Sequence, residues 1–455
     1  MVSMVRDKIL AKIKPDKKEE EKVEEFGKRL LKVAQKVSGL SSVFVGSVGK
    51  GTWLKGDHDF DLFMLFHIDV DKKDLEKKGM EYGKRITSRM KGKWIIKYAE
   101  HPYIHANIEG FVVDLVPCYR IKMKEKIKSA VDRSPLHLEY IHTNLREDLR
   151  DDVRLLKQFC KGIGVYGSDT KIQGLSGYIC ELLVIKYGRF ENVVRNIAKW
   201  SVPVVIDMEN LVFSKDLGRK FPHHPLIMID PTDSNRNAAA NVCAENLIKL
   251  VEKSKEYTEN PNEKFFFPPP TNTMNVKEII SLEKRGTKFI AIQMENLDII
   301  DDILFPQLRR MQKNMSGMLE RSDFKTIREF VFVNKNIYMI FEFETFSLPL
   351  INKLSGPPVF ESGHAKKFSK RYEEEDATVY VEGNRWFVER KRLYREPEDF
   401  LNDLKKQEKK ELINSGVPEN LSGNFMKGRI IKHKDFLGLL VKDKELSKFV
   451  KEKYF

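Results

Sequence analysis

The hydrophobic positions of the first 120 residues change between helical and strand spacing. From Pro15 to Lys36 the apolar residues recur every three or four positions, which predicts an amphipathic helix. Short apolar runs at 42–45, 61–66 and 111–116 have strand character, and a second helical stretch lies near 72–89. This order predicts an α/β or α+β domain.

After Asn144 the pattern becomes mostly helical. Helical periodicity covers 149–159, 174–187 and 235–253. The segment 260–271 then reads NPNEKFFFPPPT, and three consecutive prolines cannot continue a helix or a central strand. We therefore predict a stiff linker at this point.

The rest of the chain mixes strands and helices. A strand at 288–294 precedes an amphipathic helix at 301–320, and hairpins follow at 329–343 and 377–388. The fold class predicted is α+β and multidomain. Its predicted parts are a catalytic domain at 1–143, a mostly helical central domain at 144–262, and an α+β C-terminal region at 263–455.

Composition excludes several classes of protein. The 455 residues are 41% hydrophobic and 33% charged, as in ordinary globular proteins. No run approaches the roughly 18 apolar residues of a membrane span, and the start of the chain breaks into charge before a signal sequence forms. We therefore expect a cytoplasmic protein without a membrane partner. The four cysteines have apolar neighbours and form no Cys-x-x-Cys pair, which predicts buried reduced thiols.

The chain is basic. It has 81 Lys and Arg against 67 Asp and Glu, a formal net charge of +14. This surplus indicates an anionic partner, but alone it does not separate a nucleic acid from a membrane surface or from a role in solubility.

Three aspartates lie beside the strand-like runs of the first domain. Asp61 begins the run 61–66 and Asp59 stands two residues before it, and residues two apart on a strand point to the same face. Asp114 lies inside a later apolar run, where a lone carboxylate is costly unless it is paired or binds metal. If the two strands are neighbours, the three carboxylates converge and suit a site for two Mg²⁺ ions.

Each of these features alone has a simpler explanation. An Asp-x-Asp pair is usually a solvated turn, Gly46-Ser47 after strand 42–45 is common turn chemistry, and Asp114 could be a satisfied buried acid. Their order along the chain is more specific than any of them. Gly46-Ser47 would also place backbone N–H groups and a hydroxyl at the start of a helix, which is a favourable position for binding the phosphate groups of a substrate. The combination favours an active site.

The same motifs resemble the nucleotidyltransferase superfamily with the DNA polymerase β-like palm: Gly-Ser, then Asp-x-Asp opening a strand, then one Asp on a later strand. More narrowly, the sequence resembles the archaeal, class I CCA-adding enzymes (tRNA nucleotidyltransferases). The likeness continues through specific blocks at 133–137, 147–157, 164–168, 174–183 and 230–237. It extends more weakly through 301–308 and the region around Trp386.

This resemblance implies a role for individual residues. Asp59, Asp61 and Asp114 resemble the metal-binding catalytic triad, with Asp114 also placed to activate the 3′-hydroxyl of the primer. The residues that resemble nucleotide contacts are Ser47 and Lys50 for the triphosphate, Ser134 and His137 as a second pair, Lys157 and Tyr166 for phosphate and ribose, and Arg236 for the incoming base together with the tRNA backbone. The resemblance also implies Mg²⁺ in a two-metal site, with ATP and CTP as substrates.

At three positions the chain departs from the family pattern. Lys50 stands where Arg is usual and lacks the bidentate fork of a guanidinium. Ser134 stands where Thr is commoner. Asp57 replaces a small residue, and it either adds a carboxylate near the metals or caps the turn.

Several of these residues have simpler interpretations as well. Lys157 could be a solvated lysine, and Tyr166 a packed loop aromatic. Arg236 could pair with Asp230 or Asp233 at the start of a helix. His137 could pack under Tyr140 as a core histidine.

The C-terminal region carries basic segments with interleaved aromatics at 364–372, 385–395 and 427–434. Lysine and arginine neutralise phosphates, and aromatic rings pack on sugars or bases, so these segments fit an RNA-binding surface. The resemblance implies that the acceptor stem and the TΨC arm of tRNA are bound by shape. The oligomeric state stays open, with a homodimer among the options.

The predicted function is therefore template-independent addition or repair of the 3′-terminal CCA of tRNA, with release of pyrophosphate. Two alternatives share the same motifs. One is a poly(A) polymerase-like enzyme or another RNA nucleotidyltransferase. The other is a catalytically inert RNA-binding relative, which would be expected to lack one of the three acids.

Overall fold

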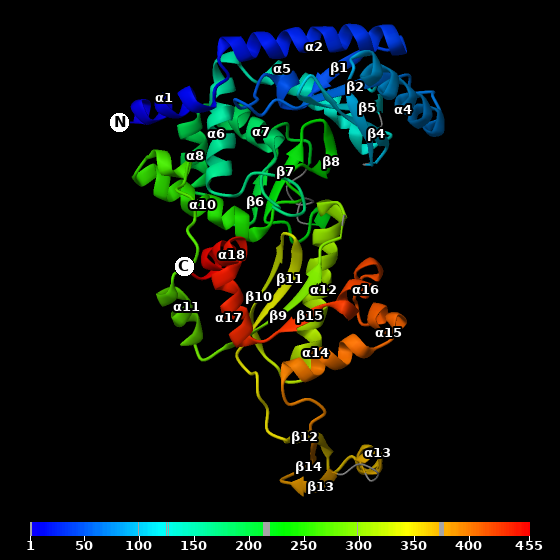
Figure 1. Cartoon of the computed structure of the whole chain (residues 1–455), viewed down its shortest axis with the longest axis vertical. Helices are drawn as coiled ribbons and strands as arrows, with labels where there is room; N and C mark the ends of the chain where they lie inside the picture. The colour runs from blue at the N-terminus through cyan, green and yellow to red at the C-terminus, as the bar shows by residue number, and fades with distance from the viewer. Residues whose placement is uncertain are drawn as a thin grey trace. The chain divides into compact units, whose positions relative to one another are not determined.

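The computed structural model describes residues 2–98, 100–123, 125, 127–212, 219–297, 299–372 and 377–455, with only the backbone of residues 2–4. The chain folds as two compact units, Met1–Pro269 and Pro270–Phe455 (Figure 1). Both units combine helices with sheets, so the predicted α+β multidomain fold is confirmed.

The first unit contains a five-stranded sheet with the order β1-β2-β5-β4-β3. Strands β2 and β5 are parallel, and the other neighbours are antiparallel. The bounds are β1 Ser42–Val45, β2 Phe60–Phe66, β3 Lys93–Tyr98, β4 Pro102–Ile108 and β5 Phe111–Tyr119.

Two long helices cover one face of this sheet. Helix α2 (Lys17–Ser38) and helix α4 (Lys72–Arg89) confirm the helices predicted at 15–36 and 72–89. Their apolar sides share one core with the inward residues of β2, β4 and β5. The side chain of Asp16 caps α2 by accepting a hydrogen bond from the backbone N–H of Glu19 at 3.0 Å. The opposite face of the sheet carries polar residues and a smaller apolar cluster that includes Val45, Phe63, Val116 and Cys118.

The remainder of the first unit packs around a second core. Helix α1 joins this core through Ile9 and Ile13, although it lies before the first sheet in the chain. The helices of this part are α1 Val2–Ile13, α5 Arg133–Asn144, α6 Arg150–Gly162, α7 Gly177–Tyr187, α8 Phe190–Ile197 and α10 Ala244–Glu259. The short helix α3 (Gly46–Lys50) lies against the first sheet instead. A three-stranded sheet, β6-β7-β8, completes it: β6 Val204–Ile206, β7 Leu226–Asp230 and β8 Asp233–Asn237.

The helix predicted at 235–253 is wrong in its first half. Residues 233–237 form strand β8, and the helix begins only at Ala244. The side chain of Asn237 holds this strand to β7, because it accepts from the backbone N–H of Met228 at 2.9 Å and donates to the carbonyl of Leu226 at 2.9 Å. Such side-chain bonds to the backbone compete with helix formation.

The second unit is built on a four-stranded sheet, β10-β11-β9-β15. Helices α12, α14 and α16 share a core with one face, and α11, α17 and α18 share a core with the other (Figure 1). A small sheet, β12-β14-β13, carries α13. The strands are β9 Lys288–Glu295, β10 Thr326–Val333, β11 Asn336–Phe343, β12 Ile351–Pro358, β13 Ala377–Glu382, β14 Arg385–Lys391 and β15 Arg429–Ile431. The helices are α11 Val276–Glu283, α12 Asp301–Arg321, α13 Ser362–Tyr372, α14 Pro397–Lys406, α15 Lys409–Asn414, α16 Glu419–Lys427, α17 His433–Lys442 and α18 Lys444–Tyr454.

Within the described ranges, no helix is both long enough and apolar enough to cross a membrane. All four cysteines are free thiols; Cys118, Cys160 and Cys180 are buried as predicted, and Cys243 is half-buried.

Candidate active site

The three predicted acids lie at one place on the first sheet. Asp61 of β2 stands directly opposite Asp114 of β5 in parallel register, so the two strands are neighbours as predicted. Asp59 precedes β2 by one residue and is exposed, whereas Asp61 and Asp114 are half-buried. All three belong to the face opposite the Phe60 and Leu62 core, because side chains alternate along a strand.

Burial and mutual repulsion act on these carboxyl groups. Burial first, and then the charges of Asp114 and Asp59, raise the pKa of Asp61 to about 6, while Lys50 opposes the rise. Burial together with Asp57 and Asp114 raises the pKa of Asp59. Like charges held this closely are stabilised by a bound cation.

Hard carboxylate oxygens on one face are the donors that Mg²⁺ prefers. Among the residues described, however, no three carboxylate, imidazole or thiol groups are already gathered as a formed metal site. Metal binding by these acids therefore stays a prediction. One neighbour is already in place, since His105 Nδ1 lies 2.6 Å from Asp114 Oδ1.

The predicted Gly-Ser motif begins helix α3 directly after β1. Gly46 has a φ of +65°, and a Cβ there would lie 2.1 Å from Asp61 Oδ2. Only glycine fits this position, because a side chain would strain the backbone and collide with the carboxylate. Ser47 follows in the first turn of α3, beside the acids.

Lys50 and Lys157 meet in a buried network that the sequence did not reveal. Lys50 Nζ lies 2.7 Å from Glu181 Oε2, and Lys157 Nζ lies 3.2 Å from Glu181 Oε1. Thr52 donates to the same carboxylate at 2.7 Å and accepts from Lys157 Nζ at 2.9 Å. Burial would raise the pKa of Glu181, but Lys50 and then Lys157 lower it to about 2.

This network changes the interpretation of both lysines. Lys157 is buried and is not the solvated lysine of the simpler interpretation. The hydroxyl of Tyr166 and the ammonium of Lys157 both lie beside Gly177, so the structure brings these two predicted contacts together. Their roles toward phosphate and ribose, and that of Lys50, stay predictions, and Glu181 is the protein partner of both ammonium groups.

A second cluster forms around the buried carboxylate of Asp230. Arg236 Nη1 lies 2.7 Å and His137 Nε2 lies 2.8 Å from Asp230 Oδ2. The hydroxyl of Tyr178 donates to Asp230 Oδ1 at 3.2 Å. Burial alone would raise the pKa of Asp230, but the hydrogen bonds from His137 and Thr232 hold this pKa well below its ordinary value.

His137 therefore has a different neighbour from the one expected. Its ring stacks on Tyr178 at 3.9 Å between centroids, with 19° between the planes. Burial lowers the pKa of His137. The stacking and the contact with Asp230 together fix the orientation of the His137 ring.

A pocket of about 730 Å³ opens over this cluster. It is lined by Ser134, His137, Tyr178 and Arg236, so it gathers three of the predicted nucleotide contacts. Lys50 links the pocket to the acids: its ammonium lies 4.8 Å above the Tyr178 ring, and its charge acts on Asp61. The volume is within the usual range for small-molecule sites.

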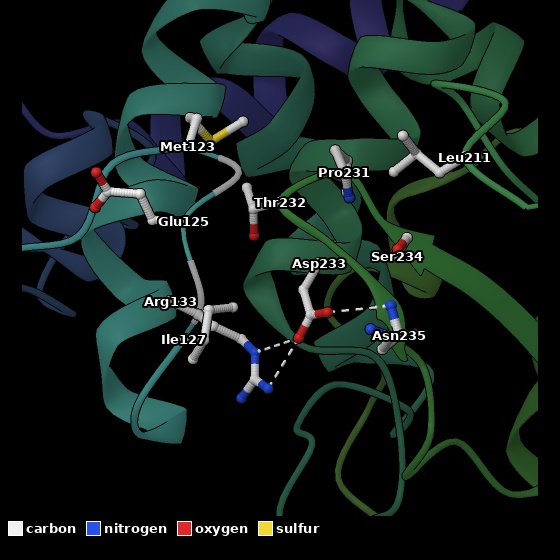
Figure 2. Close-up of a pocket in the computed structure, with 10 residues that line it drawn as sticks. All are labelled: Met123, Glu125, Ile127, Arg133, Leu211, Pro231, Thr232, Asp233, Ser234 and Asn235. Atoms are coloured by element: carbon white, nitrogen blue, oxygen red, sulfur yellow. Dashed lines mark hydrogen bonds and ion pairs between the residues drawn. The ribbon is translucent and has the colours of Figure 1, made fainter.

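A neighbouring pocket of about 570 Å³ shares Arg133 and Asn235 with the first. Figure 2 shows Arg133 and Asp233 pointing toward each other, with Arg133 Nε at 2.9 Å from Asp233 Oδ2. Asp233 also accepts from the backbone N–H of Asn235 at 3.0 Å (Figure 2). This ion pair joins α5 to β8, the strand that carries Arg236.

Asp57 has a definite partner in the structure. Its carboxylate lies 2.5 Å from Lys161 Nζ, and it is close enough to Asp59 to raise the pKa of that residue. The departure at residue 57 thus adds negative charge near the acids and also binds a lysine of α6.

Sequence reasoning missed Glu181, Thr52, Tyr178 and Asp230 as site residues. Two of them had a visible signal. Glu181 is the one acid in the run Tyr-Ile-Cys-Glu-Leu-Leu, and Asp230 ends the apolar run Leu-Ile-Met-Ile. An isolated carboxylate in such surroundings requires a partner.

Family models match three consecutive parts of the chain. They describe a nucleotidyltransferase domain at 20–137, the second domain of tRNA nucleotidyltransferase at 151–267, and the C-terminal domain of CCA-adding enzymes at 285–422. The fold and the site thus define a nucleotidyltransferase.

Curated relatives cover most of the chain. The CCA-adding enzyme of Methanosarcina acetivorans is 37% identical over 397 residues, which is 85% of this chain and 86% of that protein. The CCA-adding enzyme of Methanocaldococcus jannaschii is 33% identical over 453 residues, 96% of this chain and 98% of that protein. The chain belongs to the CCA-adding enzyme family. The predicted enzyme class and function, CCA addition by a nucleotidyltransferase, are confirmed at this level.

The solved structure of a cytoplasmic RNA terminal U-transferase covers 58% of this chain and 98% of its own, with a TM-score of 0.45 at 15% identity. A TM-score and a sequence identity this low carry no information about activity.

Proposed function

We propose that the chain completes or repairs the 3′ end of tRNA by adding C, C and A without a template. CTP and ATP are the substrates and pyrophosphate is the product. The observation that carries this proposal is the register that sets Asp61 against Asp114, next to Gly46 and Ser47 and linked by Lys50 to the pocket. It supports a phosphoryl-transfer site with a nucleotide pocket beside it.

Asp59, Asp61 and Asp114 would hold Mg²⁺, since their oxygens suit the ion and their mutual repulsion favours a cation between them. When bound, the metal supplies Lewis-acid polarisation of the triphosphate and activation of the attacking hydroxyl.

The chain's own groups position the reactants. Asp114 would accept the proton of the RNA 3′-hydroxyl, and His105 would fix the orientation of its carboxylate through the 2.6 Å contact. A bond then forms between the 3′-oxygen and the α-phosphorus, and the bond from the α-phosphorus to the bridging oxygen breaks, so that pyrophosphate leaves. Ser47 and the N-terminal turn of α3 face the phosphates.

The nucleotide would occupy the pocket over Asp230. Arg236 offers its guanidinium to the base while Asp230 holds it in place, and Ser134 and His137 line the same pocket. Lys157 and Tyr166 would contact phosphate and ribose from the central helices. A fixed guanidinium recognises the base with little loss of conformational freedom.

The macromolecular partner would be tRNA. In the second unit, Lys366, Lys367 and Lys370 of α13 and the arginines of β14 form basic segments with exposed lysines. Such surfaces bind the phosphate backbone by shape, as recognition of the acceptor stem and TΨC arm requires. A cytoplasmic location and a homodimer are further expectations from the sequence.

Incubation with tRNA transcripts that end at the discriminator base tests the proposal. With Mg²⁺, CTP and ATP, we expect C, C and A to be added and the reaction then to stop, as read by sequencing of the products. Long A tails would indicate a poly(A) polymerase-like enzyme instead. Binding without extension would indicate an inert relative.

We expect Arg236→Gln to raise KM for CTP and ATP at least tenfold, because a charge-assisted hydrogen bond to the base is worth about 1.5–3 kcal/mol. Misincorporation of UTP and GTP should rise as well. Asp230 keeps His137, Tyr178 and Thr232 as partners, so the fold should survive. Arg195→Gln, on the exposed side of α8, is the matched control. Equal KM values in the two variants would show that Arg236 does not contact the nucleotide.

A further inference from the structure

The face of the first sheet that carries the acids continues beyond Asp114. Asp61 of β2 pairs with Asp114 of β5, Asp114 pairs with His105 of β4, and His105 pairs with Ile95 of β3. Residues paired in this way point to the same face of a sheet. The row of acids is therefore extended by one residue from each of the last two strands.

Six residues of these two strands share this face, and we call them the β3–β4 strip. They are Lys93, Ile95 and Lys97 of β3, and Tyr103, His105 and Asn107 of β4. The alternate residues of β4, Ile104, Ala106 and Ile108, are buried in the core on the other side. The strip is therefore the outward face of a well-packed part of the sheet.

The strip is open and basic. Ile95 is 57% exposed, and Lys93, Lys97 and Asn107 are exposed as well. Within the part of the chain that the structure describes, no hydrogen bond or ion pair engages the ammonium group of Lys93 or Lys97. Two unpaired positive charges thus stand about 10 Å, or two strand spacings, from the row of Asp114.

The other direction away from the acids is occupied. Helix α3 contacts β1 and β2, and α5 contacts β1. On the β4 side, Tyr103 is close enough to the acids that burial, Asp114 and Asp61 together raise its pKa. An RNA strand whose 3′-hydroxyl reaches Asp114 therefore has the strip as its open path.

We propose that the β3–β4 strip binds the single-stranded 3′ end of the RNA primer, just upstream of the nucleotide that reacts. This inference rests on the proposed function. Lys93 and Lys97 contact backbone phosphates, while Ile95 and Tyr103 pack against ribose or base. Backbone contact of this kind is independent of sequence, as needed for a primer whose last nucleotide changes at each step.

A binding measurement tests the strip without relying on catalysis. The probe is a fluorescent single-stranded oligoribonucleotide ending in the discriminator base and C-C, followed by anisotropy over a salt series. For Lys93→Gln with Lys97→Gln, we expect about 10- to 30-fold weaker binding at 0.1 M salt and a salt slope smaller by about 1.4, because two phosphate contacts are lost.

The matched control is Lys77→Gln with Lys78→Gln, two exposed lysines of α4. It removes the same charge and should leave both quantities close to those of the parent. Equal weakening in the two double variants, or no weakening in the strip variant, would overturn the proposal.

Steady-state kinetics separates the strip from the proposed function. For the strip variant, KM for tRNA lacking CCA should rise about tenfold while KM for CTP and ATP stays unchanged. A fall in kcat with an unchanged KM for tRNA would contradict a primer-binding role. If the parent adds no CCA at all, the proposed function fails, and the anisotropy comparison still decides the strip.

A second copy of the chain is the other conceivable occupant, since β3 is an edge strand. Sedimentation of the parent and of Ile95→Glu distinguishes it. We expect equal masses for the two proteins together with weaker RNA binding by the variant. A dimer that dissociates on this substitution would assign the strip to self-association and overturn the RNA proposal.

Discussion

Asp61→Asn is expected to lower the rate of nucleotide addition at least about a thousandfold, which corresponds to about 4 kcal/mol of lost transition-state stabilisation. The amide keeps the size of the carboxylate but loses the charge that would hold Mg²⁺. The measurement is single-turnover addition of C to tRNA at saturating CTP. Asp69→Asn is the matched control, because that carboxylate is 84% exposed and lies in the turn after β2.

The same substitution should leave the fold intact or stabilise it. The pKa of Asp61 is raised from 3.8 to about 6, so ionisation of this group works against the folded state. The free energy of unfolding of the parent therefore falls as pH rises from about 4 to about 6, whereas the asparagine variant shows no such fall. In metal-free buffer at neutral pH, we expect the variant to be more stable by about 1–3 kcal/mol.

Activity and stability should thus move in opposite directions. Full activity in the asparagine variant would show that the acids are not the metal site. A loss of activity together with a loss of stability would point to a structural role for Asp61 instead.

Glu181→Gln is expected to destabilise the first unit by about 3–5 kcal/mol. The substitution leaves the ammonium groups of Lys50 and Lys157 buried without their counter-charge, and breaking a buried ion pair has this cost. Denaturant unfolding of the full chain, followed as the transition of the first unit, measures it. Glu81→Gln removes an exposed partner of Arg85 on α4 and should cost under about 1 kcal/mol.

Acid unfolding gives this prediction a distinct signature. The pKa of Glu181 is about 2 in the folded chain against an ordinary value of 4.5. Its contribution is therefore complete above pH 4.5 and is lost as pH falls toward 2. The glutamine variant lacks this part of the pH dependence. If the two proteins lose stability in parallel over this range, Glu181 does not hold the network together.

The acids could be located from the sequence because their signal is local. Asp59 and Asp61 open an apolar strand, Asp114 interrupts another, and a single condition, that the strands are neighbours, brings them together. The structure meets that condition through the parallel pair β2–β5. The Gly-Ser turn was predictable for the same reason, since Gly46 and Ser47 directly follow a strand.

The partners of the nucleotide pocket could not be predicted in the same way. Glu181 meets Lys50 across 131 residues, and Asp230 meets His137 across 93. Helical or strand periodicity contains no information about such distant pairs. The interpretation of Arg236 as a partner of Asp230 or Asp233 came closest, and Asp230 is the partner found.

Strands β3 and β4 were missed for different reasons. All six residues of β3 are exposed, so the run Lys-Trp-Ile-Ile-Lys-Tyr has no buried face to produce an alternation. Strand β4 alternates, but its outward residues include Tyr103 and His105, whose partly apolar side chains blur the pattern. Pairing with β5 fixes β4 in the sheet, and pairing with β4 fixes β3.

The place of helix α1 has a consequence for the order of folding. Ile9 and Ile13 pack with the central helices, and Arg6 binds Asp152, which lies 146 residues later in the chain. At a translation rate of 5–20 residues per second, the ribosome needs roughly 7 to 30 s to make this partner. During that interval α1 lacks its main partner, helix α6, and its apolar side is a candidate for chaperone binding. The first sheet can therefore form before α1, which precedes it in the chain, has docked on the central helices.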